Sequence, residues 1–162
     1  MKKYEITNET IHVYGKTFYR IKSLINFGNV TQGTLGGFIE KETNLSHDGN
    51  AWVFDDAIVC GNARVYGDAK VCGNARVYGD AKVFGNARVY DDADYLCFAG
   101  LGSCNRNTTF FKCRDGYICV SCGCFNGNLT EFENQVRETH GNTKYAKEYL
   151  ACVTVVKIHF GI

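Results

Sequence analysis

The stretch that decides the fold is Val53–Asp94, which reads VFDDAI, VCGNAR, VYGDAK, VCGNAR, VYGDAK, VFGNAR, VYDDAD. These seven hexads follow one another without an insertion, with Val always at position one and Ala always at position five. Positions two and six are mostly large or charged. Because side chains two residues apart share one face of a strand, positions six, one and two predict a short strand with its Val pointing inward.

The hexads also carry a regular corner. Positions three and four are mostly Gly-Asn or Gly-Asp, pairs that accept a positive φ in a tight turn. Two weaker units precede the run, Ile39–Asn44 and Leu45–Trp52, the second with His47 and Asp48 as a two-residue insertion at a corner. A repeat of six residues is too short for a helical repeat, so these nine hexads predict a three-sided β-helix.

The repeat resembles the hexapeptide-repeat family, whose members fold as a left-handed parallel β-helix with three hexads per coil. The resemblance implies about three coils over residues 39–94 and a homotrimeric assembly. The segment Tyr19–Ala57, YRIKSLINFGNVTQGTLGGFIEKETNLSHDGNAWVFDDA, is also similar to the start of YdcK-like hexapeptide-repeat proteins of bacteria and prophages. The likeness covers about residues 4–94, and it specifies a fold rather than a function because this fold carries many activities.

Capping segments are expected on both sides of so short a β-helix, because open strand edges invite aggregation. Residues 1–38 are predicted to be an N-terminal β cap, in which Thr10–Tyr14 and Thr17–Ile21 form a hairpin. Residues 39–94 are predicted to be the β-helix and residues 95–162 a C-terminal module. The expected fold is therefore mainly β, a left-handed parallel β-helix of about three coils with a β cap and a small C-terminal α+β module.

The C-terminal module is predicted to follow the order ββαα. Two β-rich segments, Thr108–Cys113 and Tyr117–Phe125, flank a good hairpin turn and follow a connector at residues 98–107. Asn128 with Glu131 three residues later has the spacing of a helix cap, and this helix is expected to end at Gly141. A second helix is expected to begin near Thr143. The apolar faces of the two helices are predicted to hold Leu129, Phe132, Val136, Tyr145, Tyr149, Leu150, Val153 and Val156.

Composition excludes several classes of protein. The chain has 162 residues, a formal net charge of +1, nine cysteines and no proline, which is ordinary globular composition. The balanced charge does not indicate a nucleic-acid or membrane surface, and no apolar run is long enough to span a bilayer. No apolar segment follows the first lysines, so we expect a cytoplasmic protein, in the host cytoplasm if phage-encoded, with free thiols.

Catalytic and metal sites are not predicted, although each has a candidate. Acyltransferases of this fold use a histidine as general base, and of His12, His47, His140 and His159 only His47 lies in the coils. A zinc site is the hypothesis raised by Cys113, Cys119, Cys122 and Cys124. Strand alternation would put Cys122 and Cys124 on one face with Cys119 opposite, which favours buried thiols over metal ligands. We therefore assign no catalytic residue, metal or cofactor.

The outer surface of the β-helix is the candidate binding site or oligomer interface. With an 18-residue period, each side carries a ladder of mostly cationic residues at position six beside a ladder of mostly aromatic residues at position two. Cations beside aromatic rings suit planar anionic ligands. Trp52 and Ile58 belong to these outward ladders. The candidate site residues are Arg64, Tyr66, Lys70, Arg76, Tyr78, Lys82, Phe84, Arg88 and Tyr90.

The sequence favours recognition over catalysis. We expect a non-enzymatic, phage- or prophage-type binding protein on an oligomeric β-helix, a counter-defence inhibitor that binds a host defence protein or sequesters a nucleotide signal. An acyl- or nucleotidyltransferase inherited from the fold family is the alternative, and a structural assembly protein is a third. The predicted partners are sister subunits in a trimer and a nucleotide or host protein, with no membrane partner.

Overall fold

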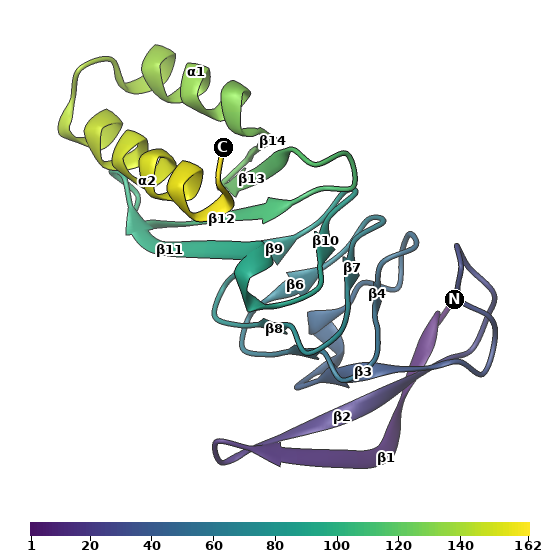
Figure 1. Ribbon diagram of the computed structural model, residues 1–162. Helices are drawn as coiled ribbons and strands as arrows, with labels where there is room; N and C mark the ends of the chain where they lie inside the picture. Colours follow the sequence, from purple (N-terminus) through teal and green to yellow (C-terminus); the bar gives the residue numbers. More distant parts are fainter. The chain divides into compact units, whose positions relative to one another are not determined.

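The hexads form stacked two-residue strands in the computed structural model, which describes residues 1–162 and is mainly β with two C-terminal helices (Figure 1). The chain divides into two compact units, Met1–Asp92 and Ala93–Ile162. In the first unit, position six of one hexad and position one of the next make one short strand. These strands are β4 (Trp52–Val53), β5 (Ile58–Val59), β6 (Arg64–Val65), β7 (Lys70–Val71), β8 (Arg76–Val77), β9 (Lys82–Val83) and β10 (Arg88–Val89).

The strands pair in parallel with the strand one period further along the chain. One sheet has the order β4-β7-β10, a second contains β5-β8, and a third is the pair β6-β9. Partners are 18 residues apart, as in Trp52 with Lys70 and Arg64 with Lys82. Because successive partners in each sheet are three strands apart along the chain, this is the topology of a three-sided parallel β-solenoid with 18 residues per coil.

The two-residue insertion predicted near His47 is confirmed by the register. Residues before the insertion pair with residues 20 positions further along the chain, since Phe38 lies opposite Ile58 and Leu45 bridges Val65. From Trp52 onward the spacing is 18. A short 3-10 helix, η1 (Glu42–Asn44), lies just before the insertion.

The core of the solenoid is built from the invariant positions of the hexad. Every position-one Val and every position-five Ala from Ala51 to Val89 has an exposed fraction of 0%. Small Ala side chains at the corners and Val side chains on the strands therefore fill the interior, as the alternation predicts.

The N-terminal segment forms the predicted hairpin. Strand β1 (Tyr4–Val13) pairs with β2 (Lys16–Ser23), and β2 pairs with β3 (Leu35–Ile39), which joins the β5-β8 sheet. The turn residues Tyr14 and Gly15 have φ values of 50° and 74°, as a tight two-residue hairpin turn requires. Figure 1 shows this hairpin, in purple, extending from the coils.

Two residues predicted to point outward are buried instead. Trp52 has an exposed fraction of 0% and makes edge contacts with Tyr4 and Phe27. Ile58 is packed with Phe18 and Phe38 from β2 and β3. The hexad does place both side chains outward from the coil, but the N-terminal segment covers this part of the surface. The repeat pattern contains no information about that cover.

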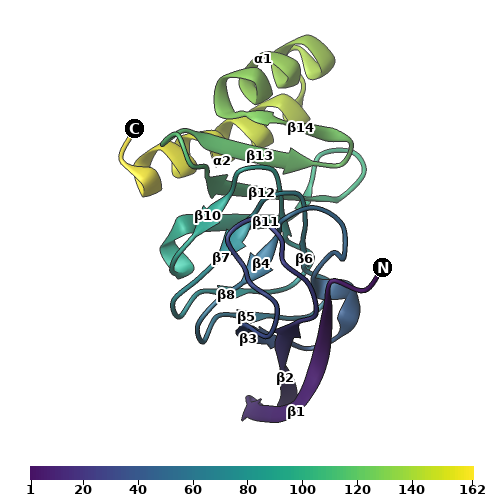
Figure 2. The ribbon, with the colours of Figure 1, turned by 90° about the vertical axis from the view of Figure 1, so that its right-hand side faces the viewer.

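The second unit contains an antiparallel sheet and two helices. The sheet order is β11 (Tyr95–Leu101), β12 (Arg106–Lys112), β13 (Ile118–Cys122) and β14 (Phe125–Asn128), after the 3-10 helix η2 (Asp92–Asp94). Helices α1 (Leu129–His140) and α2 (Lys144–Phe160) pack on one face of this sheet (Figure 2). The predicted ββαα order is therefore wrong, because the sheet has four strands.

The missed strands have simple causes. The predicted connector at residues 98–107 holds the end of β11, which pairs with β12 across a turn at Gly102. The single predicted strand Tyr117–Phe125 is interrupted at Gly123, where a φ of 62° starts the turn into β14. Both helices are confirmed with their caps, Asn128 for α1 and Thr143 for α2.

The cysteines are not all free thiols, which corrects the sequence prediction. Cys113 and Cys119 form a disulfide, with their Cα atoms 6.2 Å apart. The turn after Cys113 folds β13 back along β12, where Phe111 lies opposite Cys119. This brings the two cysteines within the range of Cα separations that disulfides span. The prediction of free thiols rested on the number of cysteines, which does not show that two of them lie diagonally across a hairpin.

Candidate ligand-binding sites

The nine predicted site residues are distributed over all three sides of the solenoid. The first side is the β4-β7-β10 sheet, the second is β5-β8 and the third is β6-β9. The first carries Lys70, Arg88 and Tyr90, the second Arg76 and Tyr78, and the third Arg64, Tyr66, Lys82 and Phe84. All nine are exposed or half-buried.

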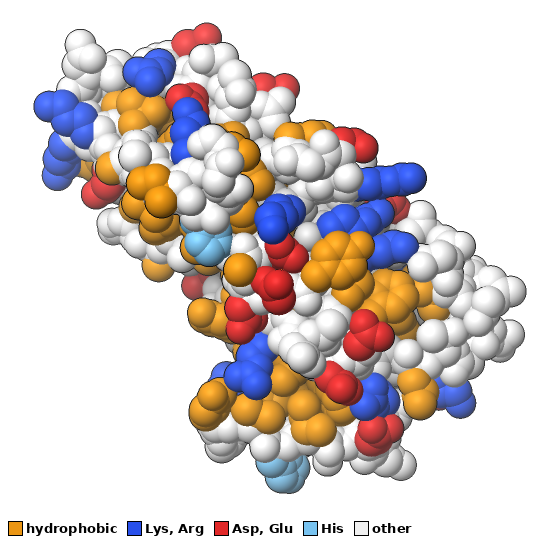
Figure 3. All heavy atoms as spheres, in the orientation of Figure 1, with side chains coloured by type: hydrophobic (Ala, Val, Ile, Leu, Met, Phe, Trp, Pro, Cys, Tyr) orange, Lys and Arg blue, Asp and Glu red, His pale blue; other side chains and the backbone are white.

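On the first side, the cations are held by oxygen atoms of the chain itself. Lys70 Nζ donates a hydrogen bond to Asn29 Oδ1 at 2.6 Å and lies 5.6 Å from the centre of the Phe54 ring. Arg88 Nη1 donates to the carbonyl oxygens of Ala87 at 2.7 Å and Asp68 at 3.1 Å. Hydrophobic and basic side chains lie next to each other over β4, β7 and β10 (Figure 3). A cleft of about 370 Å³ on this side includes Phe54, Lys70 and Tyr90 among its lining residues.

The second side lies beside the N-terminal hairpin. The guanidinium of Arg76 is 5.9 Å from the centre of the Tyr14 ring, at the hairpin turn. Ile58, one coil below Arg76, is buried against Phe18 of the hairpin and Phe38 of β3. The N-terminal segment therefore packs on this side of the solenoid.

The third side carries four predicted residues, and three of them, Arg64, Tyr66 and Lys82, line a cleft. The rings of Tyr66 and Phe84 stack with their centres 5.4 Å apart and an angle of 14° between them. Beside them lie Arg64 and Lys82, which are both exposed and occupy paired positions of β6 and β9. The cleft has a volume of about 470 Å³ and is lined by Ser46, Asp48, Gly49, Arg64, Tyr66, Gly67 and Lys82.

The electrostatics of this cleft are mixed. Burial raises the pKa of the Tyr66 hydroxyl, and the nearby Arg64 charge opposes that rise, so the phenol is a neutral hydrogen-bonding group at neutral pH. Asp48 adds one carboxylate to the lining of the same cleft. A second hollow of about 640 Å³ adjoins it through Ser46, Asp48 and Arg64, so Arg64 lines both.

His47 is tied into the structure at both ring nitrogens. Its Nδ1 accepts a hydrogen bond from the Lys3 backbone N–H at 3.2 Å, and its Nε2 lies 3.0 Å from Glu42 Oε1. The ring also stacks on Tyr4, with centres 4.3 Å apart. Because Nδ1 accepts a hydrogen bond, Nε2 carries the ring proton and donates a hydrogen bond to Glu42 Oε1. These contacts fasten strand β1 to the corner insertion.

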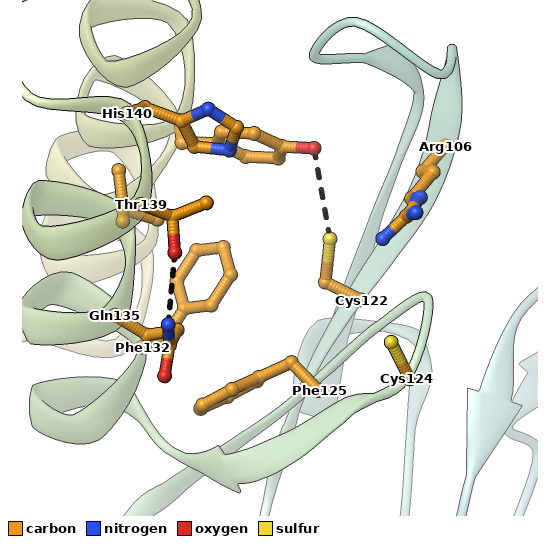
Figure 4. Close-up of a pocket in the computed structure, with 10 residues that line it drawn as sticks. Arg106, Cys122, Cys124, Phe125, Phe132, Gln135, Thr139 and His140 are labelled. Carbon is orange, nitrogen blue, oxygen red and sulfur yellow. Dashed lines mark hydrogen bonds between the residues drawn. The ribbon is translucent and has the colours of Figure 1, made fainter.

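A pocket in the second unit was not predicted from the sequence. It has a volume of about 370 Å³ and lies between α1 and the strands, as Figure 4 shows. Its lining residues are Arg106, Cys122, Cys124, Phe125, Phe132, Gln135, Val136, Thr139, His140 and Tyr149. They come from β12, the β13-β14 turn and both helices, so no local spacing connects them.

The four cysteines considered as metal ligands are separated by the fold. Cys113 and Cys119 form the disulfide, and Cys124 lies exposed in the turn after β13. Cys122 is buried, accepts a hydrogen bond from Thr108 Oγ1 at 3.1 Å, and lies 3.8 Å from Tyr149 Oη. Cys122 and Cys124 thus do not share a strand face as predicted, because the chain turns at Gly123 between them.

The stacked parallel strands define the repeat as a β-solenoid. In agreement with this class, a family model described as the YdcK beta solenoid repeat matches residues 69–83, which contain β7, β8 and β9. The match supports a β-solenoid family for the repeat. No curated protein matches the chain. Neither helix combines the length and apolar character needed to cross a membrane.

Proposed function

We propose that this chain is a non-enzymatic binding protein whose third-side cleft recognises a planar anion bearing phosphate, that is, a nucleotide. The observation that carries the proposal is the placement of Arg64 and Lys82 on adjacent paired strands beside the stacked rings of Tyr66 and Phe84. Arg64, Lys82 and the Tyr66 ring line one cleft, and cations beside an aromatic ring are what a base and its phosphates require.

The spacing of the two cations suits phosphate. Paired strands in a sheet are roughly 4.8 Å apart, so the stems of Arg64 and Lys82 begin at about that separation. Two cations this close can contact different oxygens of one phosphate or neighbouring phosphates of one chain. The Tyr66 hydroxyl adds a neutral donor, and Asp48 is an acceptor for a sugar hydroxyl or a base amine.

The charge of the solenoid favours short-range recognition. Residues 47–94 contain eight Asp against five Lys and Arg, a local net charge of −3. Long-range attraction of phosphate is therefore weak, and affinity has to come from direct contacts inside the cleft. This charge fits a compact ligand better than a long nucleic acid.

A general base is not available at His47 in this arrangement, which supports binding rather than acyl transfer. Both ring nitrogens are engaged, one by the Lys3 N–H and the other by Glu42. Proton abstraction from a substrate needs a ring nitrogen within reach of that substrate.

The assembly and biological setting belong to the same proposal and rest on the resemblance to hexapeptide-repeat proteins of phages and prophages. We propose that the coils close into a left-handed β-helix and that three chains associate. The proposed role is counter-defence, in which the protein sequesters a nucleotide signal or blocks a host effector. Native mass spectrometry of the purified protein tests both the trimer and any bound small molecule.

The binding test is calorimetric titration of the full chain with linear and cyclic nucleotides. The double variant Arg64→Gln, Lys82→Gln is expected to weaken binding by roughly tenfold or more, since each substitution removes a charged hydrogen-bond donor. Lys22→Gln is the matched control, because Lys22 is exposed on β2 and lies in neither hollow of the third side. Equal affinities for the double variant and the wild type, or no heat with any nucleotide, would exclude this site.

The enzymatic alternative is tested separately. Wild type and His47→Ala are compared in a sensitive acetyl-CoA turnover assay. We expect no turnover from either protein. Turnover that is lost in the His47→Ala variant would replace the binding proposal with acyl transfer.

A further inference from the structure

The pocket between α1 and the strands of the second unit has the chemistry of a ligand site that is separate from the solenoid cleft. We propose that it binds a small aromatic carboxylate, with the ring among the aromatic side chains and the carboxylate on Arg106. This inference does not depend on the function proposed for the solenoid.

The walls of the pocket are aromatic. Phe132 lies at the centre of a group of rings, 5.3 Å from Phe125 and 5.7 Å from Tyr149, measured between ring centres. His140 stacks on Tyr149 at 5.7 Å with an angle of 25° between the rings. Phe132 and Tyr149 are buried in the core of the unit, so these surfaces are fixed in place. Fixed rings in offset and edge arrangements favour a flat aromatic guest.

The charge of the pocket is provided by Arg106. Figure 4 shows Arg106 on the strand side, opposite the α1 residues Gln135, Thr139 and His140. None of the lining residues is Asp or Glu. The nearby Glu148 accepts a hydrogen bond from the Gly102 N–H at 2.7 Å, so its carboxylate is occupied outside the pocket. An anion therefore meets one guanidinium and no opposing carboxylate in the lining.

The Arg106 guanidinium lies next to the turn between β13 and β14. A side chain at Gly123 would collide with the Arg106 guanidinium, so the guanidinium lies against the backbone of this turn. Gly123 has a φ of 62°, and the turn it starts also presents Cys124 to the pocket. Arg106 is an exposed residue, and its planar guanidinium fork matches the two oxygens of a carboxylate.

The size and remaining polar groups limit the ligand further. A volume of about 370 Å³ falls at the small end of ligand pockets, which suits one or two fused rings. The Tyr149 hydroxyl already has two hydrogen-bond partners, because it donates to the Leu101 carbonyl oxygen and accepts from the Cys122 thiol. Gln135 Nε2 donates to Thr139 Oγ1 at 2.8 Å, so these α1 side chains can exchange that bond for one with a polar substituent of the ligand.

The test uses naphthoate as the probe and the neutral naphthamide as its matched analogue. The full chain is labelled with ¹⁵N, and amide resonances are followed during titration with each compound. We expect naphthoate to shift resonances of residues around the pocket, among them Gly123 and Thr139, and naphthamide to bind roughly tenfold or more weakly. No shifts with naphthoate up to about 5 mM, or equal binding of the amide, would overturn the proposal.

Two variants locate the site. Arg106→Gln is expected to weaken naphthoate binding by about tenfold or more, while Arg114→Gln, in the exposed turn at the other end of β12, leaves it unchanged. Thr139→Trp fills the pocket from an exposed position of α1 and is expected to abolish binding without disturbing the core. Wild-type affinity in Arg106→Gln or in Thr139→Trp would show that naphthoate binds elsewhere.

Discussion

At the scale of single residues, the buried Lys3 links the stability of the first unit to pH. Its side chain is 1% exposed, and Nζ donates to the carbonyl oxygens of Ala51 at 2.8 Å and Gly49 at 3.4 Å. Burial lowers the pKa of Lys3 from 10.5 to about 8, against the opposing effect of Asp48. Between these two pKa values the unfolded chain binds more protons than the folded chain, so folding becomes more favourable as pH rises.

The expected result is a gain of about 1 kcal/mol in the free energy of unfolding from pH 7 to pH 9 that is attributable to Lys3. The measurement is urea denaturation followed by Trp52 fluorescence, comparing wild type with Lys3→Met. The methionine variant lacks the titrating group, so the difference between the two pH profiles isolates it. Parallel profiles for the two proteins would mean that Lys3 keeps its proton in the folded state throughout this range.

At the scale of elements, the corner glycines differ in what surrounds them. Gly49 has a φ of 70°, and a Cβ there would lie 2.6 Å from the carbonyl oxygen of Gly67 in the next coil. Gly85 has a φ of 60° but nothing within 4 Å of such a Cβ. Alanine at either position carries the cost of a left-handed backbone, about 1–2 kcal/mol. At Gly49 the alanine methyl also pushes two stacked coils apart.

We therefore expect Gly49→Ala to lower the free energy of unfolding by at least about 1 kcal/mol more than Gly85→Ala does. Both variants are compared by urea denaturation with Trp52 fluorescence as the probe, because all three residues lie in the first unit. Equal losses would show that stacking of the corners tolerates a methyl group at Gly49.

Elements with a local cause could be predicted from the sequence, and elements with a distant cause could not. The cap of α1 is local: Asn128 Oδ1 accepts from the Glu131 N–H, while the Glu131 side chain accepts from the Asn128 N–H. The burial of Trp52 has a distant cause, because Tyr4 lies far from it in the sequence. The ladder of Arg64 and Lys82 is visible in the 18-residue period of the sequence. The pocket around Arg106 is not, because four separate segments, β12, the β13-β14 turn, α1 and α2, assemble it.

At the scale of the whole molecule, the two units have different spectroscopic reporters. The single Trp of the chain, Trp52, is buried in the first unit, whereas both α-helices belong to the second. The second unit also contains its own hydrophobic core and the disulfide between Cys113 and Cys119. A unit with its own core is expected to unfold with its own transition. Trp fluorescence and helical ellipticity should therefore report two different events.

Reduction of the disulfide should move only one of these transitions. In the chain-entropy account, a cross-link between residues six apart in sequence stabilises by roughly 2 kcal/mol. For a unit of this size that corresponds to roughly 10 °C in Tm. With reductant, the helical ellipticity is expected to melt that much earlier while Trp52 fluorescence melts unchanged. The double variant Cys113→Ala, Cys119→Ala should melt early with or without reductant. A shift of the Trp52 transition on reduction would show that the two units unfold as one.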